Sequence, residues 1–409
     1  MKAVERVKAA TEFLGPDKVP VWKIGSGDVF VMVMVPSEKW KPGHEEDERG
    51  LFPHPFDEAI IRSGLWEWEK PDWAKNNPKY EGMKWLEVDR EELDIWGSIW
   101  ERRGDGSTMG HPGKPSLPDW NMLDNYLDRY TPDPFDKSQY SPFFIDRVDT
   151  AARNKYRICV LGLMGPLLTA ANMRGFTNFL IDHKRHPDKV KRLLEHLTQW
   201  NVEHMDAWIK YGAKPQAFNL VEDLGTQQGP FMSPKQFEKF YKPVYETIFK
   251  AAHDRNCDIV QHCCGKIDAI LPYLIEWGLD AIELDSPRMT GYNDLREFRG
   301  KIMFWGCVNI QSIYTRGTPE ECEREVWHMM RNLGTPKGGF GAYFYPQPYH
   351  INVPPQNVAG FNKGLKRYSV YNRIPQSWWN YPVIEEWKDD VVPSLPPIEN
   401  SEIKFNSRR

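Results

Sequence analysis

Short apolar runs alternate with amphipathic helical stretches along the chain from about Tyr156 onward. The short runs are rich in β-branched and aromatic residues, and between them apolar residues recur every three to four positions, as on one face of a helix. Several helical stretches open with Ser-Pro or Thr-Pro, a capping residue followed by proline at the first helical position. The predicted strands are residues 157–163, 216–223, 258–263, 280–285, 301–309 and 339–346. The predicted helices are residues 186–212, 233–256, 266–278, 318–334 and 354–368.

Regular alternation of strand and helix predicts a parallel sheet covered by helices. Two earlier strands, at residues 18–25 and 29–35, bring the number of strand-helix units to about eight. Eight units favour a closed barrel over an open sheet, and no GxGxxG motif follows the first strand to indicate dinucleotide binding. The expected fold class is therefore α/β, a (β/α)8 TIM barrel with a long lid-like insertion in its N-terminal half.

The predicted insertion is residues 66–135, which are rich in Trp, Pro, Gly and charged residues and contain a hairpin-like segment at 87–106. Loops of this length in a compact domain usually carry function, so we expect a lid or substrate platform. The rest of residues 1–376 is predicted to be a single barrel domain. Residues 377–409, rich in Trp and Pro, are predicted to form an extension that packs on the barrel.

Composition restricts the class of partner. A net charge of −4 with interspersed signs offers no basic surface for nucleic acid, and no apolar run approaches membrane-spanning length. The N-terminal segment lacks the apolar core of a signal peptide, and the six cysteines are scattered without a disulfide pattern. We therefore expect a cytoplasmic enzyme that acts on a small molecule, with no nucleic acid or membrane partner and with a homodimer left open.

The residues His262, Cys263 and Cys264 end a predicted strand and precede Gly265. Alternate residues of a strand share a face, so His262 and Cys264 point the same way and Cys263 points away. An imidazole nitrogen beside a thiolate sulfur is a donor pair that suits zinc. The alternative is ordinary packing, because cysteine is among the most buried residue types.

The carboxyl ends of the strands face the active site of a (β/α)8 barrel. This rule gathers polar and sulfur-containing side chains around one cavity. They are Glu222, Asp223, His262, Cys264, Glu283, Asp285, Cys307, Asn309 and residues 345–350.

Five segments also occur in a characteristic order: SLPDWNMLDNYLDRYTPDP, EDLGTQQGPFMSPKQFEKFYKPVY, QHCCGKIDAILPYLIEWGLDAIELD, GCVNIQSIYTRGTPEECEREV and YPQPYHINVPPQNVAGF. In order and spacing the last four resemble the uroporphyrinogen decarboxylase superfamily, and the first is similar to its corrinoid-methyltransferase relatives. The resemblance covers residues 10–370 approximately. It implies a (β/α)8 barrel with the active site at the carboxyl ends of the strands, in agreement with the count of units.

The resemblance implies one of two chemistries. Porphyrinogen decarboxylases carry an arginine-rich loop after the first strand, which binds the propionates of the substrate, whereas this chain reads VPVWKIGSGDVFVMVMVPSEKW. The methyltransferase branch holds zinc with a His-x-Cys pair and one further ligand, and takes its corrinoid from a separate protein. His262 and Cys264 match that pair, so the resemblance favours a corrinoid-dependent methyltransferase.

The third zinc ligand departs from the family pattern. Thiol-activating relatives have a cysteine after the last strand, where this chain has approximately Gln347. Cys307 is the expected replacement, and Glu222 is the harder alternative. A site short of one cysteine suits an oxygen-bound methyl group, so we expect a methoxylated, aromatic donor, an O-demethylation reaction and cob(I)alamin as the methyl acceptor.

Further side chains are assigned roles under this hypothesis. His350 is expected to donate a proton or orient the substrate, with Asp223 and Asn309 as further catalytic groups; the alternatives are a structural histidine and helix caps. The expected substrate-binding residues are Glu222, Asp285, Trp96, Tyr345 and Tyr349. Aromatic residues in the insertion (Trp85, Trp96, Trp100, Trp120) and the last strand (Tyr343, Phe344, Tyr345, Tyr349) offer surfaces for an arene.

Three alternatives stay open at this level. The first is the opposite direction, a methylcorrinoid:thiol methyltransferase. The second is a metal-free decarboxylase of a small acid, and the third is a non-catalytic corrinoid-binding barrel.

Overall fold

The computed structural model describes residues 1–35, 60–61, 78, 81–82, 89–104, 111–346, 348–371, 374 and 379. The chain divides into two compact units. Unit 1 comprises residues 1–31, 148–160 and 215–409, and unit 2 comprises residues 32–147 and 161–214. Among the described residues, no helix has the length and apolar character needed to cross a membrane.

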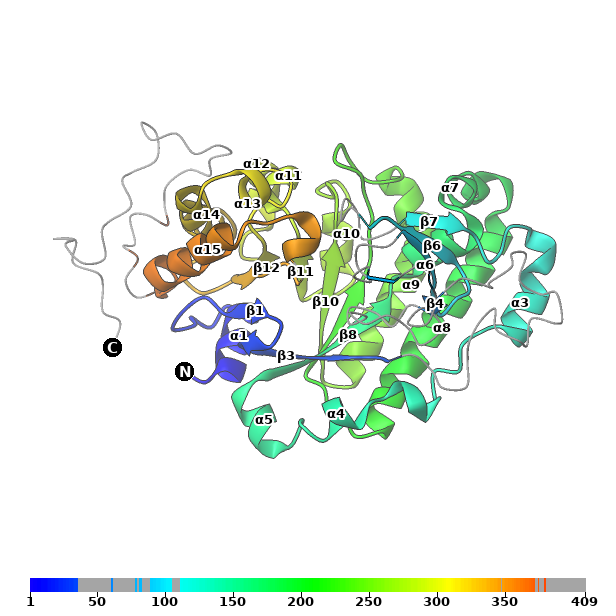
Figure 1. Cartoon of the computed structure of the whole chain (residues 1–409), viewed down its shortest axis with the longest axis horizontal. Helices are drawn as coiled ribbons and strands as arrows, with labels where there is room; N and C mark the ends of the chain where they lie inside the picture. The colour runs from blue at the N-terminus through cyan, green and yellow to red at the C-terminus, as the bar shows by residue number, and fades with distance from the viewer. Residues whose placement is uncertain are drawn as a thin grey trace. The chain divides into compact units, whose positions relative to one another are not determined.

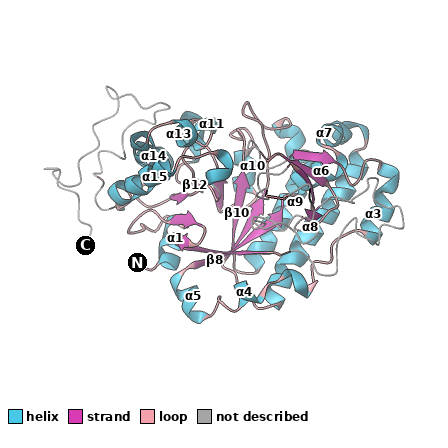
Figure 2. Ribbon diagram, viewed as in Figure 1, coloured by secondary structure: helices cyan, strands magenta, loops and turns pink. Residues whose placement is uncertain are grey.

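A nine-stranded sheet has the order β2-β1-β13-β12-β11-β10-β9-β8-β3. Its strands are β1 (Val21–Lys23), β2 (Ser26–Gly27), β3 (Val29–Val33), β8 (Arg157–Met164), β9 (Ala217–Val221), β10 (Asp258–Cys263), β11 (Ala281–Leu284), β12 (Met303–Gly306) and β13 (Phe340–Tyr343). The strands β9 to β13 each pair in parallel with the next, and β1 pairs in parallel with β13. Helices lie around these strands, as expected for an α/β fold (Figure 2).

The two ends of this sheet come together at Asp28, which alone separates β2 from β3 in the sequence. The Asp28 carboxylate accepts a hydrogen bond from the backbone N–H of Val21 in β1 (2.8 Å), and its carbonyl accepts one from Arg157 in β8 (2.9 Å). The sheet order therefore returns on itself as in a barrel. All eight strands expected from the sequence are present, and the predicted TIM-barrel fold class is confirmed.

Two capped helices of unit 1 begin where the sequence signals predict, whereas the helix predicted at 266–278 begins only at Leu271. Ser233 caps α9 (Pro234–Asp254) by accepting from Gln236 N, and Thr318 forms a capping box with Glu321 at the start of α14 (Pro319–Leu333). The remaining helices of this unit are α1 (Ala3–Thr11), α5 (Thr150–Lys155), α10 (Leu271–Glu276), α11 (Pro287–Thr290), α12 (Tyr292–Leu295), η7 (Arg296–Phe298), α13 (Ile313–Arg316), η8 (Pro348–Ile351) and α15 (Pro355–Tyr368). Figure 1 shows α14 and α15 side by side.

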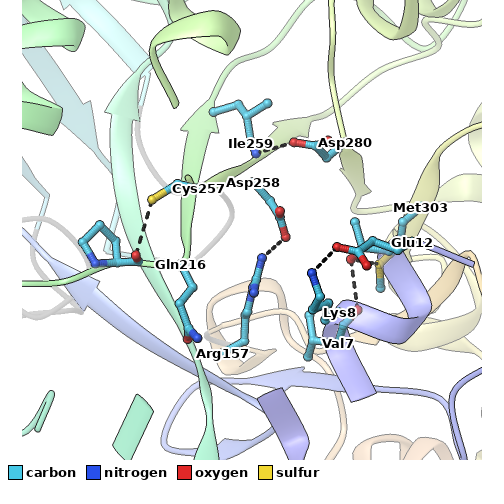
Figure 3. Close-up of polar contacts among 12 residues, drawn as sticks. Val7, Lys8, Glu12, Arg157, Gln216, Cys257, Asp258, Ile259, Asp280 and Met303 are labelled. Atoms are coloured by element: carbon cyan, nitrogen blue, oxygen red, sulfur yellow. Dashed lines mark hydrogen bonds and ion pairs between the residues drawn. The ribbon is translucent and has the colours of Figure 1, made fainter. Parts of the chain in front are cut away.

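Polar contacts close the amino-terminal end of the barrel strands (Figure 3). Arg157, the first residue of β8, forms an ion pair with Asp258, the first residue of β10. The backbone N–H of Ile259 donates to the Asp280 carboxylate (2.8 Å), and the Cys257 thiol donates to the carbonyl of Pro215 (3.4 Å). In (β/α)8 barrels this end contributes to stability and the opposite end carries the chemistry.

Unit 2 contains three consecutive helices and a small sheet. The consecutive helices are α6 (Pro166–Arg174), α7 (Phe176–Arg185) and α8 (Pro187–Lys210), of which the sequence pattern predicted α8 alone. The same unit contains the short helices η5 (Trp120–Met122), α3 (Leu123–Arg129), η6 (Lys137–Gln139) and α4 (Pro142–Ile145). The sheet has the order β4-β5-β6-β7, with β4 (Ile60–Ile61), β5 (Arg90–Leu93), β6 (Ile99–Arg102) and β7 (His111–Lys114). The strands β5 and β6 pair antiparallel, so the hairpin predicted at 87–106 is present.

The predicted domain boundaries stay predictions. Unit 2 groups residues 32–147 with residues 161–214, a division that the sequence pattern does not contain. Much of the predicted insertion at 66–135, and all of the extension at 377–409 except Trp379, lie outside the described residues.

Candidate metal centre

Residues at the carboxyl ends of three neighbouring strands of unit 1 meet above the apolar interior of the barrel. Register pairs His262 of β10 with Glu283 of β11 on one side and with Val221 of β9 on the other. Alternate residues of a strand share a face, so His262 and Glu283 lie on the same face of the sheet as the buried core residues Val260 and Ala281, which precede them by two positions. Among the described residues, two sets have ligand atoms within 4.8 Å of one another: Asp223, His262 and Cys264, and His262, Glu283 and Asp285.

Glu283 fixes the orientation of His262. Its Oε2 is hydrogen-bonded to Nδ1 of the imidazole, and the Glu283 side chain is 2% exposed. The other ring nitrogen, Nε2, lies 3.4 Å from the Cys264 sulfur and 3.8 Å from Oδ1 of Asp223. Metal-binding histidines are usually oriented in this way, with a carboxylate on the nitrogen that faces away from the metal.

The Cys264 sulfur lies between His262 and Asp285. Its thiol is 3.3 Å from Oδ2 of Asp285, and the Cys264 backbone N–H donates to Oδ1 of Asp223 (2.9 Å). One nitrogen, one sulfur and a carboxylate oxygen of Asp223 thus converge, and a carboxylate oxygen of Asp285 lies beside the sulfur. They come from three consecutive strands of the barrel.

These separations match the geometry of zinc. Zinc lies about 2.1 Å from imidazole nitrogen and about 2.3 Å from thiolate sulfur, so a tetrahedral angle places those two atoms about 3.6 Å apart. The separation between His262 Nε2 and Cys264 Sγ is 3.4 Å. The pair can therefore bind one ion with little movement.

Two buried oxygens at this centre have no hydrogen-bond partner, namely Oε1 of Glu283 and Oδ1 of Asp285. A buried carboxylate oxygen without a partner is costly, so native proteins supply one. A cation close to both acids would satisfy them. The donor set and its unpaired oxygens therefore fit a divalent metal ion.

In the absence of metal, the surroundings of His262, Cys264 and Glu283 favour the protonated forms of these side chains. Burial disfavours the imidazolium, but Glu283 and Cys264 outweigh burial and raise the pKa of His262 well above its usual range. Burial and the neighbouring Asp285 raise the pKa of the Cys264 thiol well above its usual range. Burial also raises the pKa of Glu283, to about 7. A metal ion would reverse these shifts by favouring the deprotonated ligands.

The structure does not place the two expected third ligands with this pair. Cys307 follows β12, is fully buried and interacts electrostatically with Asp285 and Glu283, yet it belongs to neither set of converging ligand atoms among the described residues. Glu222 lies on the opposite face of the sheet, because the strand pleat turns it away from Asp223. Its Oε2 accepts a hydrogen bond from the hydroxyl of Tyr245 in α9 (2.8 Å).

The structure places the other expected catalytic residues, Asp223, Asn309 and His350, differently. Asp223 lies in the candidate metal centre. The Asn309 side chain caps its own turn, accepting from the backbone N–H groups of Gln311 (3.0 Å) and Ser312 (2.9 Å), so the capping alternative describes it. The backbone of His350 lies in η8, and Gln347 is outside the described residues.

The expected aromatic surface is only partly near the centre. Tyr345 follows β13 and interacts electrostatically with Asp285 and Cys264, and Tyr349 in η8 is 46% exposed. Trp96 is 1% exposed and packs edge-on against Trp200 inside unit 2, so its ring presents no surface for a substrate. Of the other lid tryptophans, Trp85 lies outside the described residues, and the indoles of Trp100 and Trp120 donate to Asp94 and Asp182 in the same unit.

Glu283 is the functional residue to which sequence reasoning gave no individual role. A signal was present, since Glu283 is an acid within the apolar run AIEL of a strand buried on both faces. Acids are almost never fully buried unless paired, so such an acid predicts a partner across the sheet. The register that makes His262 this partner is visible only in the structure.

Comparison with known proteins gives the family. The family model described as Uroporphyrinogen decarboxylase (URO-D) matches residues 108–361, more than half of the chain. The chain belongs to the URO-D family. The matched residues include all those of the candidate metal centre, from Asp223 to Asp285.

Two known proteins are similar to this chain. It is 22% identical over 160 residues to the Methylated-thiol--coenzyme M methyltransferase of Methanosarcina mazei, a match that spans 39% of this chain and 41% of that protein. A solved structure, a methyltransferase from Methanosarcina mazei, has a TM-score of 0.56 at 14% identity and covers 90% of this chain and 98% of its own. The second match shows a shared fold, and together they confirm the resemblance expected from the sequence.

Proposed function

We propose that this URO-D family protein is a methyltransferase that moves a methyl group from a methoxylated, aromatic substrate to the corrinoid of a separate protein. The donor set at the metal centre carries the proposal: one sulfur, one nitrogen and carboxylate oxygens. Zinc surrounded by thiolates suits a thiol substrate, whereas oxygen ligands make a harder ion that suits an ether oxygen.

His262 and Cys264 would hold zinc, with Asp223 or Asp285 as the third ligand in place of Cys307. This leaves one position of a tetrahedral site for the substrate, as catalytic zinc sites require. When bound, zinc would act as a Lewis acid toward the ether oxygen. Glu283 keeps Nδ1 of His262 occupied, so that Nε2 presents its lone pair to the metal position.

The transfer breaks the bond between the methyl carbon and the ether oxygen. The methyl group passes to the reduced corrinoid, and the oxygen keeps the electron pair of the broken bond and leaves as a phenolate. Burial and the neighbouring Asp285 raise the pKa of Tyr345, so its hydroxyl stays protonated and can donate a hydrogen bond to that oxygen. Water or His350 then supplies the proton that completes the phenol.

Methyl transfer to a thiol is the second candidate. The printed name of the Methanosarcina mazei relative specifies methylated-thiol and coenzyme M, which favours a sulfur substrate for that protein. Recruitment of Cys307 by zinc would favour the same chemistry here. Decarboxylation of a porphyrinogen is less well supported, because the segment after the first strand lacks the arginines expected for a polycarboxylate substrate.

Zinc content and a panel of methyl donors test the proposal. Wild-type protein should bind one zinc per chain, Cys264→Ala should lose it, and Cys307→Ala should keep it. With reduced corrinoid protein, methoxyarenes should be demethylated in preference to methanol, methylamines and methylated thiols. Faster turnover of methylated thiols would select the second candidate, and absence of zinc from the wild type would refute the proposed metal centre.

A further inference from the structure

Lys266, two residues after Cys264, connects three loops at the carboxyl end of the barrel strands. Its backbone N–H donates to the carbonyl of Thr226, in the loop that follows β9 (2.7 Å). Its ammonium group donates to the carbonyl of Thr290 in α11 (2.8 Å) and forms an ion pair with Asp294 in α12, beyond β11. Lys266 belongs to the segment that follows β10. Its hydrogen bonds and ion pair connect this segment to the segments that follow β9 and β11.

The first two loops touch backbone to backbone through a pair of glycines. Gly265 has a φ of +96°, and a Cβ at this position would lie 2.2 Å from the carbonyl oxygen of Gly225. A Cβ on Gly225 would lie 2.7 Å from the carbonyl oxygen of Lys266. Side chains at either position would push the loops apart. Their contact allows the Asp223 carboxylate to reach the backbone N–H of Cys264.

The third loop is a rigid anchor for the ammonium group. Arg288 of α11 binds the buried Glu325 of α14 through two contacts, Nε to Oε1 (3.1 Å) and Nη2 to Oε2 (2.7 Å). The hydroxyl of Tyr292 in α12 donates to the same carboxylate (2.8 Å). Bidentate pairs of this kind hold both position and orientation, so the carbonyl that Lys266 binds is fixed by α14.

Each of the three connected loops carries one residue of the candidate metal centre: Cys264 is a proposed ligand, and Asp223 and Asp285 are the alternatives for the third ligand. Asp223 lies in the loop after β9, Cys264 in the loop after β10, and Asp285 immediately after β11. We propose that Lys266 is a positioning residue of the metal centre, which holds these three side chains at metal-binding separation by binding their loops to one another. The inference rests on the metal centre of the proposed function, and on neither the identity of the methyl donor nor that of the acceptor.

The test compares Lys266→Met with Lys242→Met in the full-length protein. Methionine keeps most of the apolar stem and removes the ammonium group. Lys242 on α9 is a matched lysine with ion-pair distances of 3.7 Å to Glu246 and 3.8 Å to Glu276, and it contacts none of the three loops through these bonds. Zinc affinity is measured by competition with a chelator, and the visible spectrum of the Co²⁺-substituted protein reports the arrangement of the ligands.

Lys266→Met should bind zinc about 10–100-fold more weakly than the wild type, the usual effect of losing a group that orients metal ligands. Its Co²⁺ spectrum should change, Lys266→Arg should recover part of the affinity, and Lys242→Met should match the wild type. Asp294→Asn, which removes the negative charge that pairs with the ammonium group, should weaken zinc binding in the same direction if Lys266→Met does not fold.

Two negative outcomes are distinguishable. Wild-type protein that binds neither zinc nor Co²⁺ would refute the metal centre and with it the proposed function. Wild-type zinc affinity and an unchanged Co²⁺ spectrum in both Lys266→Met and Asp294→Asn would refute the positioning role of Lys266 alone.

Discussion

Glu283 is an acid in the interior of a barrel strand, and its hydrogen bond to His262 accounts for its presence there. Replacing it with glutamine preserves the volume but removes the negative charge that orients the imidazole. We expect Glu283→Gln to weaken zinc binding about 10–100-fold, while Cys264 still contributes its sulfur. Chelator competition on the purified variant measures the change.

Glu222→Gln is the matched control for that substitution. Glu222 is equally buried, but its carboxylate bonds to Tyr245 on the helix-facing side of β9, and glutamine can still accept this hydrogen bond. Zinc affinity should therefore remain at the wild-type value. A similar loss of zinc affinity in both variants would mean that any buried charge on these strands affects the site. That result would contradict a specific role for Glu283.

Zinc binding should release protons and strengthen as pH rises. In the metal-free protein the pKa values of His262 and Cys264 are both raised well above their usual ranges, so both ligands carry protons near neutral pH. A metal ion must displace those protons, and raising the pH removes part of that cost. Calorimetric titration in buffers of different ionisation enthalpy counts the protons, and a pH-independent zinc affinity would contradict the ligand assignment.

Part of this centre could be predicted from the sequence and part could not. The period of a strand was sufficient to place His262 with Cys264 and to turn Cys263 away. The sequence could not show which of the adjacent acids Glu222 and Asp223 lies on the same face as His262. That depends on how β9 is aligned with β10, which is the strand register. Register is set by packing of the whole sheet and is not visible in the sequence. From the sequence Asp285 was expected to bind substrate, and the structure shows it beside the Cys264 sulfur.

At the scale of elements, the strands were more predictable than the helices. Every barrel strand has an apolar run bounded by turn residues. The long amphipathic helices α8, α9, α14 and α15 each begin with a proline, and Ser233 and Thr318 also cap α9 and α14. The helix α6 was not predicted, because it is buried around most of its circumference and shows no polar face. Gly175 then separates α6 from α7 with a φ of +84°, which divides what would otherwise read as one helical stretch.

The ion pair between Arg157 and Asp258 joins β8 to β10 at the end of the barrel opposite the metal centre (Figure 3). Arg157→Met would leave the Asp258 carboxylate mostly buried without its cation. We expect the free energy of unfolding to fall by about 1–3 kcal/mol, less than for a fully buried pair because Asp258 keeps some contact with water. Urea denaturation measures the change.

The same substitution should leave zinc affinity unaffected, since it acts at the amino-terminal end of the strands. The double variant Arg157→Met/Asp258→Asn removes the unpaired charge and should recover part of the lost stability. If the double variant were no more stable than the single one, the loss would come from packing of the arginine stem instead of the buried charge.

At the scale of the whole molecule, the grouping into two units was not predictable from local pattern. Unit 2 combines residues 32–147 with residues 161–214, which flank residues 148–160 of unit 1 in the sequence. Periodicity and capping report on neighbours along the chain, whereas this grouping depends on contacts between distant segments. The sequence accordingly predicted a single barrel with an insertion.

Unit 2 should lose stability in acid because of the buried histidine His204. In unit 2, His204 is fully buried, stacks on Trp200, accepts from the indole N–H of Trp208 (3.0 Å) and is hydrogen-bonded to Tyr140 (2.9 Å). Burial lowers its pKa from 6.5 to about 3. Below about pH 6.5 the unfolded chain therefore binds a proton that the folded unit does not, and stability falls as pH decreases toward 3, by at most about 1.4 kcal/mol per pH unit.

His204→Gln should remove that dependence, because glutamine does not titrate. Hydrogen exchange of α8 at about pH 7 and about pH 5 follows the stability of unit 2, in a window above the usual carboxylate range. Burial also lowers the pKa values of His183 and His196, so the variant should keep a smaller acid sensitivity than the wild type. An equal loss of protection between the two pH values in both proteins would mean that His204 can take up a proton within the folded unit.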